Sequence, residues 1–270
     1  LDIGSNDGTS LSFYPEEVEK VGVDPSGKRF INNYPVNSIL IPEFFDEEIV
    51  LKFNQSNKYF DIITSFAMFY DLPDPVHFAG NIEKLLSNEG VWCLEQSYLP
   101  AMIKQNAFDT ICHEHIEYYC FSDLKKIFDK VGLKALDVTF NETNGGSFKV
   151  LCCKKSSKHK PKKTVDKTIN YENQYFSNKG IFEEFKNRID SLKYDLRKMI
   201  IELKNKGKKV YGLGASTKGN VLLQYFNLNK DLIDAIGEVN ESKFGKFTPG
   251  TNIPIVNQKE ILQEKNSCFL

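Results

Sequence analysis

Apolar and polar positions in the first half of the chain follow two alternating patterns. Short apolar runs predict buried strands at residues 21–24, 60–65 and 90–95. Between the last two runs, apolar residues recur at close to helical spacing over residues 76–86. Strands separated by helices usually pair in parallel, so this half of the chain predicts an α/β domain with a mostly parallel sheet.

The end of this first domain has a different pattern. Ser122 is placed to cap a helix that runs to Val131, and Gly132 follows where helices commonly end. Residues 133–140 and 147–153 flank an Asn-Gly-Gly turn and predict an antiparallel pair. We therefore assign residues 1–153 to the first domain and expect an antiparallel edge on its sheet.

Residues 154–207 are predicted to connect two domains. The stretch 154–168 is polar and basic without an apolar period, which favours a solvated linker or, alternatively, a phosphate-binding tail. From Phe182 to Leu203 apolar residues follow three-four spacing, which predicts one long amphipathic helix. Its apolar seam would pack against the protein's own domains or form a dimer interface.

Residues 208–270 repeat the strand–helix alternation and predict a second, smaller Rossmann-like α/β domain. The predicted strands lie at residues 209–214, 232–239 and 253–256, and a helix lies at 217–226. The chain begins within the end of one predicted strand and stops at the start of another. Because a natural domain seldom ends inside a core strand, we expect the chain to be a fragment of a longer protein.

Composition narrows the class of protein. Apolar residues make up 41% and charged residues 26% of the 270 residues, and no run approaches the ~18 apolar residues of a membrane span. A net charge of −1 gives no general attraction to nucleic acid or to acidic lipid. The chain has only six cysteines and no signal-peptide pattern, which indicates a cytoplasmic protein. The cysteines form no C-x-x-C pair, so we expect no metal site in this chain.

The segment Asp2-Ile3-Gly4-Ser5-Asn6-Asp7-Gly8 follows the first predicted strand. Its glycines allow a tight turn and a close approach of the backbone to a ligand. Asp24 lies 22 residues after Asp2, at the end of the next strand, where a carboxylate can accept both hydroxyls of a ribose. An acid before the first glycine suits a cationic nucleoside such as S-adenosylmethionine better than a pyrophosphate. A turn without a ligand remains the alternative.

Two further segments carry candidate chemistry. His113-Glu114-His115 follows the third strand, and a histidine beside a carboxylate suits a general base, although a hydrogen-bonded structural pair is also open. Residues 212–220 (GLGASTKGN) link a strand to a helix. Their main-chain N–H groups, hydroxyls and Lys218 ammonium would hold a phosphate or diphosphate, unless the segment is only a capped turn.

Taken together, these segments resemble the bacterial sugar C-methyltransferases, which are S-adenosylmethionine-dependent enzymes that act on nucleotide-linked 4-keto sugars. The matching segments are DIGSNDGT at 2–9, GVDPS at 22–26, FDTICHEHIEYY at 108–119, NGGSF at 144–148, YGLGASTKGN at 211–220 and FGKFTPGTNIPI at 244–255. The resemblance implies a Rossmann-like class I methyltransferase domain and a smaller Rossmann-like domain joined by the long helix. It also implies a small N-terminal zinc-binding domain, which this chain lacks.

The resemblance further implies a set of site residues. The residues for the methyl donor are Asp2, Gly4, Ser5, Asn6, Gly8, Asp24, Ser65 and Phe66. Those for the reacting centre are His115 and Glu114. Those for the nucleotide-linked sugar are Tyr118, Tyr119, Asn144, Ser216, Thr217, Lys218 and Asn220. Cys112 departs from the tyrosine that family members often carry, so the position or substituent of the substrate is expected to differ.

The implied reaction follows from carbon acidity. A ketone at C4 of the sugar acidifies the proton on C3, which His115 would remove with Glu114 orienting it or tuning its charge. C3 would then attack the methyl group of S-adenosylmethionine and release S-adenosylhomocysteine, without a metal. The resemblance leaves the nucleotide, the sugar and the choice between monomer and homodimer open.

Three other interpretations remain. The first is methyl transfer to oxygen or nitrogen of a small metabolite, which leaves the loop at 212–220 unexplained. The second is an oxidoreductase that binds a nicotinamide in the C-terminal domain, with Glu238 as the ribose acid. The third is a non-catalytic assembly protein whose function is the apolar seam of residues 182–203.

Overall fold

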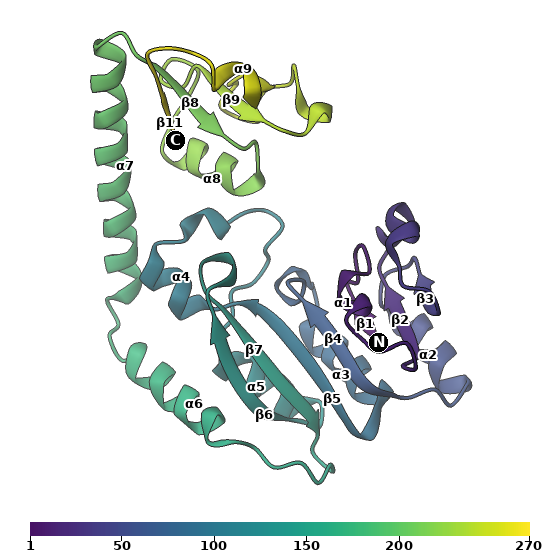
Figure 1. The fold of residues 1–270 in the computed structure, drawn as a ribbon. Helices are drawn as coiled ribbons and strands as arrows, with labels where there is room; N and C mark the ends of the chain where they lie inside the picture. Colours follow the sequence, from purple (N-terminus) through teal and green to yellow (C-terminus); the bar gives the residue numbers. More distant parts are fainter. The chain divides into compact units, whose positions relative to one another are not determined.

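The computed structural model describes residues 1–270, and the chain divides into two compact units. Unit 1 comprises residues 1–102 and 116–178, and unit 2 comprises residues 103–115 and 179–270. The short segment 103–115 thus belongs with the C-terminal residues, a grouping that a linear sequence pattern does not reveal. Each unit is a separate α/β layer structure (Figure 1).

Seven strands form the sheet of unit 1, in the order β3-β2-β1-β4-β5-β7-β6. Their bounds are β1 Asp2–Ile3, β2 Lys20–Val23, β3 Ser38–Ile41, β4 Phe60–Phe66, β5 Leu86–Ser97, β6 Leu133–Asn141 and β7 Ser147–Lys154. The first five strands are parallel, and β7 runs antiparallel between β5 and β6. The strand order reverses at β1, and ligands of such sheets bind beyond the carboxyl ends of the strands at this point. The predicted Rossmann-like sheet with an antiparallel edge is confirmed.

The helices of the first 178 residues are α1 Thr9–Ser12, α2 Glu47–Gln55, α3 Pro75–Leu85, α4 Leu99–Gln105, α5 Phe121–Lys130 and α6 Lys163–Tyr175. Apolar residues of α2, α3, α5 and α6 join one core with the sheet. Its centre is the fully buried Trp92 of β5, whose ring lies 5.7 Å from Phe69, 6.1 Å from Phe78 and 5.7 Å from Phe128. Each aromatic pair of this kind contributes about 0.5–1.5 kcal/mol beyond its buried area.

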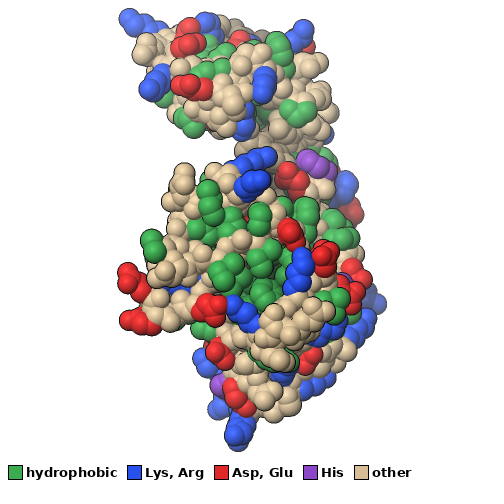
Figure 2. Space-filling view, turned by 90° about the vertical axis from the view of Figure 1, so that its right-hand side faces the viewer, with side chains coloured by type: hydrophobic (Ala, Val, Ile, Leu, Met, Phe, Trp, Pro, Cys, Tyr) green, Lys and Arg blue, Asp and Glu red, His purple; other side chains and the backbone are tan.

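The other side of the sheet is more open. Ile62 and Phe66 of β4 are 46% and 37% exposed, although both are large apolar residues. Hydrophobic side chains gather over part of the surface of unit 1, among acidic and basic ones (Figure 2).

Helix α6 begins inside the stretch 154–168, which the sequence predicted to be a linker. Val165 packs into the core, and Glu172 is 1% exposed. The Glu172 carboxylate accepts the main-chain N–H groups of Phe121 and Ser122 at 2.7 and 2.8 Å and the Tyr98 hydroxyl at 2.9 Å. It therefore caps the N-terminus of α5, where N–H groups have no partner within the helix. The apolar face of α6 is narrow and its neighbours in sequence are basic, so the sequence shows no helical period of apolar residues here.

Unit 2 contains a four-stranded parallel sheet in the order β10-β9-β8-β11. Its elements are α7 Ile181–Asn205, β8 Lys209–Leu213, α8 Thr217–Tyr225, β9 Ala235–Glu238, β10 Ile255–Asn257, α9 Gln258–Ile261 and β11 Ser267–Phe269. The strand order reverses at β8, so this sheet also has a switch point, next to the loop that leads into α8. The predicted second, smaller Rossmann-like layer is confirmed. None of the helices combines the length and the apolar character that a membrane crossing requires.

Candidate functional site

The first glycine turn lies at the carboxyl end of β1, at the switch point of the unit 1 sheet. Gly4 and Gly8 have φ values of 76° and 78°, which side chains rarely adopt, and Asn6 has a φ of 45°. The Gly4 N–H donates to the Val23 carbonyl at 2.9 Å, so the turn stays joined to β2 as it leaves the sheet. The backbone of the predicted donor-binding segment is therefore tightly folded, and it lies where the sheet topology places a ligand.

Asp24 closes this turn from the end of β2. Its Oδ2 accepts the Asn6 N–H at 2.9 Å, and its Oδ1 accepts the Ser26 N–H and hydroxyl, both at 2.6 Å. A carboxylate has about four acceptor positions, so three protein donors leave about one position for a ribose hydroxyl. Asp24 thus holds the loop in addition to its predicted role toward the ribose.

Tyr34 completes the turn, and the sequence analysis missed it. Its hydroxyl lies 2.9 Å from the Ser5 Oγ and donates to the Asn6 carbonyl at 3.0 Å. A Cβ on Gly8 would lie 3.0 Å from the Tyr34 ring, which is closer than side-chain atoms normally approach. Gly8 is therefore required both by its backbone angle and by this ring. A ring 26 residues away in sequence leaves no motif by which to find it.

Asp2 is the buried acid of the site. It is 2% exposed, and its Oδ1 accepts the Thr64 hydroxyl at 2.6 Å. Burial raises the pKa of Asp2 to about 6, because the charged carboxylate loses its water. A cationic group near Asp2 would favour the ionised form.

Two predicted donor-site residues end β4, and their side chains have different environments. Ser65 is 1% exposed, and its Oγ accepts the Trp92 indole N–H at 2.9 Å. Its side chain therefore belongs to the core, and only its backbone could line a donor pocket. Phe66 is 37% exposed, and Ala67 after it has a φ of 52°.

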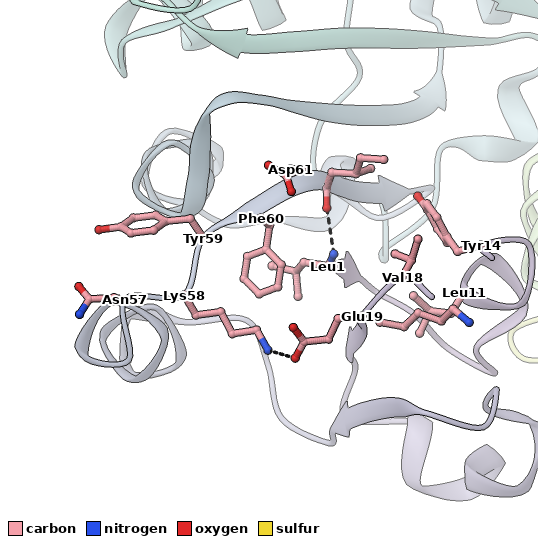
Figure 3. Close-up of a pocket in the computed structure, with 12 residues that line it drawn as sticks. Leu1, Leu11, Tyr14, Val18, Glu19, Asn57, Lys58, Tyr59, Phe60 and Asp61 are labelled. Atoms are coloured by element: carbon pink, nitrogen blue, oxygen red, sulfur yellow. Dashed lines mark hydrogen bonds and ion pairs between the residues drawn. The ribbon is translucent and has the colours of Figure 1, made fainter. Parts of the chain in front are cut away.

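Unit 1 also has a pocket away from the glycine turn (Figure 3). It has a volume of about 550 Å³ and is lined by residues near the amino ends of β1, β2 and β4, among them Glu19, Lys58 and Phe60. Lys58 and Glu19 form an ion pair at its edge. Ligands of parallel α/β sheets bind at the opposite, carboxyl ends of the strands, where the glycine turn is. We therefore do not assign the predicted chemistry to this pocket.

His115 belongs to unit 2, as the last residue of the segment 103–115. Its Nδ1 lies 2.7 Å from the carbonyl oxygen of Thr110. A carbonyl only accepts hydrogen bonds, so Nδ1 carries the proton and the basic lone pair of the neutral ring is on Nε2. Glu114, which was expected to orient His115, instead lies 4.0 Å from the His113 Nε2, and both side chains are largely exposed. One partner that orients the His115 ring is thus a main-chain carbonyl, which has no sequence signature.

The segment that carries His115 is fastened to α7 and α8. Arg188 of α7 donates to the Ile103 carbonyl at 2.7 Å and to the Asn106 Oδ1 at 2.8 Å. The Phe108 ring stacks on Phe226, with their centroids 5.0 Å apart. One compact unit therefore contains the histidine and the predicted phosphate loop.

That loop runs from β8 to α8 and is fixed by Glu238 of β9. Ser216 caps α8 by accepting the Gly219 N–H at 3.0 Å, and Gly214 has a φ of 88°. Glu238 accepts the N–H groups of Ala215, Val239 and Asn240 at 3.0, 2.8 and 3.0 Å. These bonds lower the pKa of Glu238 to about 2. The carboxylate that a nicotinamide site would direct to a ribose is thus bonded to the loop itself.

The remaining predicted residues are dispersed. Thr217, Lys218 and Asn220 are half-buried in the first turn of α8. Tyr119 is 4% exposed, and its ring lies 5.4 Å from Phe69 while its hydroxyl donates to Glu117. It is therefore a core residue of unit 1. Tyr118 is half-buried nearby in sequence, and Asn144 is exposed in the β6–β7 turn with a φ of 54°.

Fold and site together define a two-unit α/β protein with a glycine-containing turn at the switch point of each sheet. The methyltransferase domain family matches residues 1–138, and the C-methyltransferase C-terminal domain family matches residues 142–270. The chain therefore belongs to the methyltransferase family and carries the C-methyltransferase C-terminal domain. The predicted family membership is confirmed.

The chain is similar to the C-methyltransferase NovU of Streptomyces niveus, with 29% identity over 259 residues. This similarity covers 94% of the chain, and the chain spans 61% of the length of that relative. Among solved structures, a SAM-dependent methyltransferase from Anabaena variabilis has a TM-score of 0.45 at 13% identity, covering 57% of this chain and 75% of that one. The plantazolicin methyltransferase BpumL has a TM-score of 0.43 at 12% identity, with the same coverages. Such remote structural similarity supports no functional conclusion.

Proposed function

We propose that the chain is an S-adenosylmethionine-dependent C-methyltransferase whose substrate is a nucleotide-linked 4-keto deoxysugar. Its membership of the methyltransferase family and the name of its C-methyltransferase relative support the reaction class. The hydrogen bond between the His115 Nδ1 and the Thr110 carbonyl carries the proposal, because it prepares a base within the unit that holds the loop of α8. A nucleophilic carbon must first lose a C–H proton, and such a base would take it.

In this proposal unit 1 holds the methyl donor. The turn of Gly4 and Gly8 lets the backbone approach the nucleoside, and Asp24 has an acceptor position left for a ribose hydroxyl. Asp2 would lie toward the ammonium group of the donor, which would offset the cost of burying its charge. This donor set fits a cationic nucleoside. It suits a pyrophosphate poorly, because two carboxylates would face an anion.

Unit 2 would hold the acceptor. The N–H groups at the start of α8, the hydroxyls of Ser216 and Thr217 and the Lys218 ammonium suit a diphosphate. Asn220 ends the first turn of the same helix. Glu238 accepts the Ala215 N–H, and Lys243 donates to the Ala215 carbonyl and to Glu238. These bonds hold the loop and its donors in place before a ligand binds. Such preorganisation lowers the entropy lost on binding.

The reaction then has two steps. His115 takes the C3 proton through Nε2, and the electron pair of the C–H bond moves into an enolate on the C4 ketone. C3 forms a bond to the donor methyl group, the carbon–sulfur bond breaks, and its electron pair leaves with the thioether sulfur of S-adenosylhomocysteine. The protein contributes chiefly by holding the carbon and the methyl group in contact, which can lower the barrier by several kcal/mol.

The test is hydrogen exchange at C3. The full chain is incubated in deuterium oxide with a nucleotide-linked 4-keto-6-deoxy sugar and S-adenosylhomocysteine, and deuterium at C3 is followed by NMR. We expect exchange without methyl transfer, and a C-methylated product when S-adenosylmethionine replaces S-adenosylhomocysteine. A product methylated on oxygen or nitrogen, with no C3 exchange, would establish the alternative methyltransferase chemistry.

A further inference from the structure

One buried side chain of unit 1 has a polar group without a partner in the chain. Gln96 is 2% exposed, and neither its Oε1 nor its Nε2 atom is hydrogen bonded to another protein group. A glutamine amide has two N–H donors and a carbonyl acceptor, and burying these groups without partners costs free energy. An apolar side chain of similar length would fill the position without that cost. The amide therefore points to a partner that the chain itself does not supply.

Gln96 lies at the carboxyl edge of the unit 1 sheet, beside the predicted donor site. It is the penultimate residue of β5, and the Ala67 N–H just after β4 donates to the carbonyl of the neighbouring Glu95 at 2.8 Å. The residues predicted for the methyl donor come from the ends of β2, β1 and β4, and β5 is the next strand across the sheet. Because the acceptor carbon must touch the donor methyl group, a side chain at this position is placed to contact the acceptor.

The groups around Gln96 are apolar or hydrogen bonded elsewhere. Phe148 of β7 lies opposite Gln96 and is fully buried. The Tyr98 ring lies 5.0 Å from the Phe148 ring, and its hydroxyl donates to Glu172 at 2.9 Å. Close packing of this kind restricts the side-chain conformations of Gln96. The amide is therefore held in place before a ligand binds.

The segment 116–119, which directly follows the proposed base in the chain, is fastened just beyond the ends of β4 and β5. Two of its N–H groups donate to the Tyr70 carbonyl at 3.0 and 3.1 Å, and its Tyr119 carbonyl accepts the Leu99 N–H at 3.0 Å. Tyr70 follows β4, and Leu99 follows β5. These bonds bring the segment to the corner of the sheet where Gln96 lies.

We propose that Gln96 binds the C4 oxygen of the keto sugar and stabilises the enolate, an inference that rests on the proposed function. The ketone oxygen accepts an N–H of the amide, and this bond strengthens as the oxygen gains negative charge in the enolate. The amide keeps its protons, so it stabilises the charge while His115 acts as the base. Its carbonyl oxygen is left to accept a hydroxyl of the same sugar.

The experiment measures both the stability and the turnover of Gln96→Met, which keeps the length of the side chain and removes the amide. The Tm of the ligand-free full chain should rise by about 2 °C or more, because an unpartnered buried amide is gone. The rate of C3 deuterium exchange, measured with a nucleotide-linked 4-keto-6-deoxy sugar and S-adenosylhomocysteine, should fall about 10²–10³-fold. Calorimetric affinity for S-adenosylhomocysteine should stay within about twofold.

Gln55→Met is the matched control, because Gln55 is exposed at the end of α2 in the same unit. This substitution should change neither the Tm nor the exchange rate. Gln96→Leu is a second variant for the case in which Gln96→Met does not fold, and the same two results are expected of it.

The outcomes separate the role of Gln96 from the proposed function. A higher Tm together with slower exchange supports an amide that serves the ligand. A lower Tm would mean that the amide serves the fold, and it would overturn the proposal. Wild-type exchange that Gln96→Met leaves unchanged overturns the role of Gln96 alone. If the wild-type chain shows no C3 exchange, the proposed function fails, and the role of Gln96 fails with it.

Discussion

The main-chain N–H of Asn6 lies 2.9 Å from the Oδ2 of Asp24, so the turn after β1 is joined to the acid that ends β2. The two residues are 18 positions apart, and β1 and β2 pair in parallel with Asp2 opposite Gly22. Parallel pairing brings the carboxyl ends of both strands to the same edge. The loop that we propose to bind a nucleoside and the acid that we propose to accept its ribose are therefore held together by the protein's own hydrogen bond.

Asp24→Asn should weaken S-adenosylhomocysteine at least tenfold, or about 1.4 kcal/mol. The amide keeps one acceptor oxygen but loses the charge that accepts the Asn6 and Ser26 donors and a ribose hydroxyl. Ser26→Ala is the control, because it removes one of these bonds and leaves the carboxylate in place. Calorimetric titration of both variants measures the difference, and equal losses would show that Asp24 only braces the loop.

Gly8→Ala should destabilise the chain and also reduce its affinity for S-adenosylhomocysteine. The φ of 78° costs a side chain about 1–2 kcal/mol, and the new methyl group would push the Tyr34 ring away from the turn. Gly132→Ala is a matched control, since Gly132 has a φ of 82° and open space around it. Thermal unfolding should show a loss of stability in both variants. Calorimetry should show weaker binding in Gly8→Ala alone.

Asp2→Asn should make the ligand-free chain more stable at pH 8 than the wild type. The pKa of Asp2 in the folded chain, about 6, lies above its ordinary value of 3.8, so the folded state binds the proton more tightly than the unfolded state. Stability therefore falls as pH rises from about 4 to about 6, by at most about 3 kcal/mol, and stays lower above this range. Asparagine removes this loss.

Urea unfolding of Asp2→Asn and the wild type at pH 4 and pH 8 checks the sign of this effect. The stability difference should be large at pH 8 and close to zero at pH 4, and Asp61→Asn, at an exposed site, should show neither. A difference that is independent of pH would mean that charge burial is not its source. The same variant should bind S-adenosylhomocysteine more weakly, because the partner of its ammonium is lost.

Much of the fold follows from sequence patterns, because strong apolar periods survive in it. The predicted long helix is α7, and the predicted antiparallel pair is β6 and β7. Strand β3 and helix α2 were not predicted, although Asp46 caps α2 and Ile49 and Val50 face the core. Their apolar runs are short, and only the neighbouring strands and helices make them buried.

The candidate site was predictable in its side-chain motifs and unpredictable in its supporting contacts. Glycine turns and acids at strand ends placed both loops at the carboxyl edges of their sheets. The Tyr34 ring packs on Gly8 and so supports the glycine turn. Thr110 orients His115 through its main-chain carbonyl, a group that any residue carries. Neither leaves a pattern in the sequence, because both depend on the folded path of the chain.

Glu238→Gln should loosen the loop before α8. The pKa of about 2, against an ordinary value of 4.5, means that the ionised carboxylate stabilises the folded state above pH 4.5, and that this contribution is lost as pH falls through about 2. The amide weakens the bonds from Ala215, Val239 and Asn240 and the ion pair with Lys243. Pyrophosphate affinity at pH 7 should fall severalfold. Glu241→Gln, at an exposed position nearby, should have no effect in the same titration.

His115→Gln should abolish proton transfer and leave ligand binding intact. General base catalysis typically contributes 10²–10⁴-fold, so the rates of C3 deuterium exchange and of methyl transfer should both fall by that factor. Calorimetric affinities for S-adenosylhomocysteine and nucleoside diphosphates should stay within about twofold, because the bond to the Thr110 carbonyl orients a base and does not hold a ligand. His113→Gln is the matched control, since the His113 side chain is 85% exposed. This substitution should change neither the exchange rate nor the methyl-transfer rate. If His115→Gln instead weakens S-adenosylhomocysteine while exchange continues, His115 is a donor-site residue and another group must remove the proton.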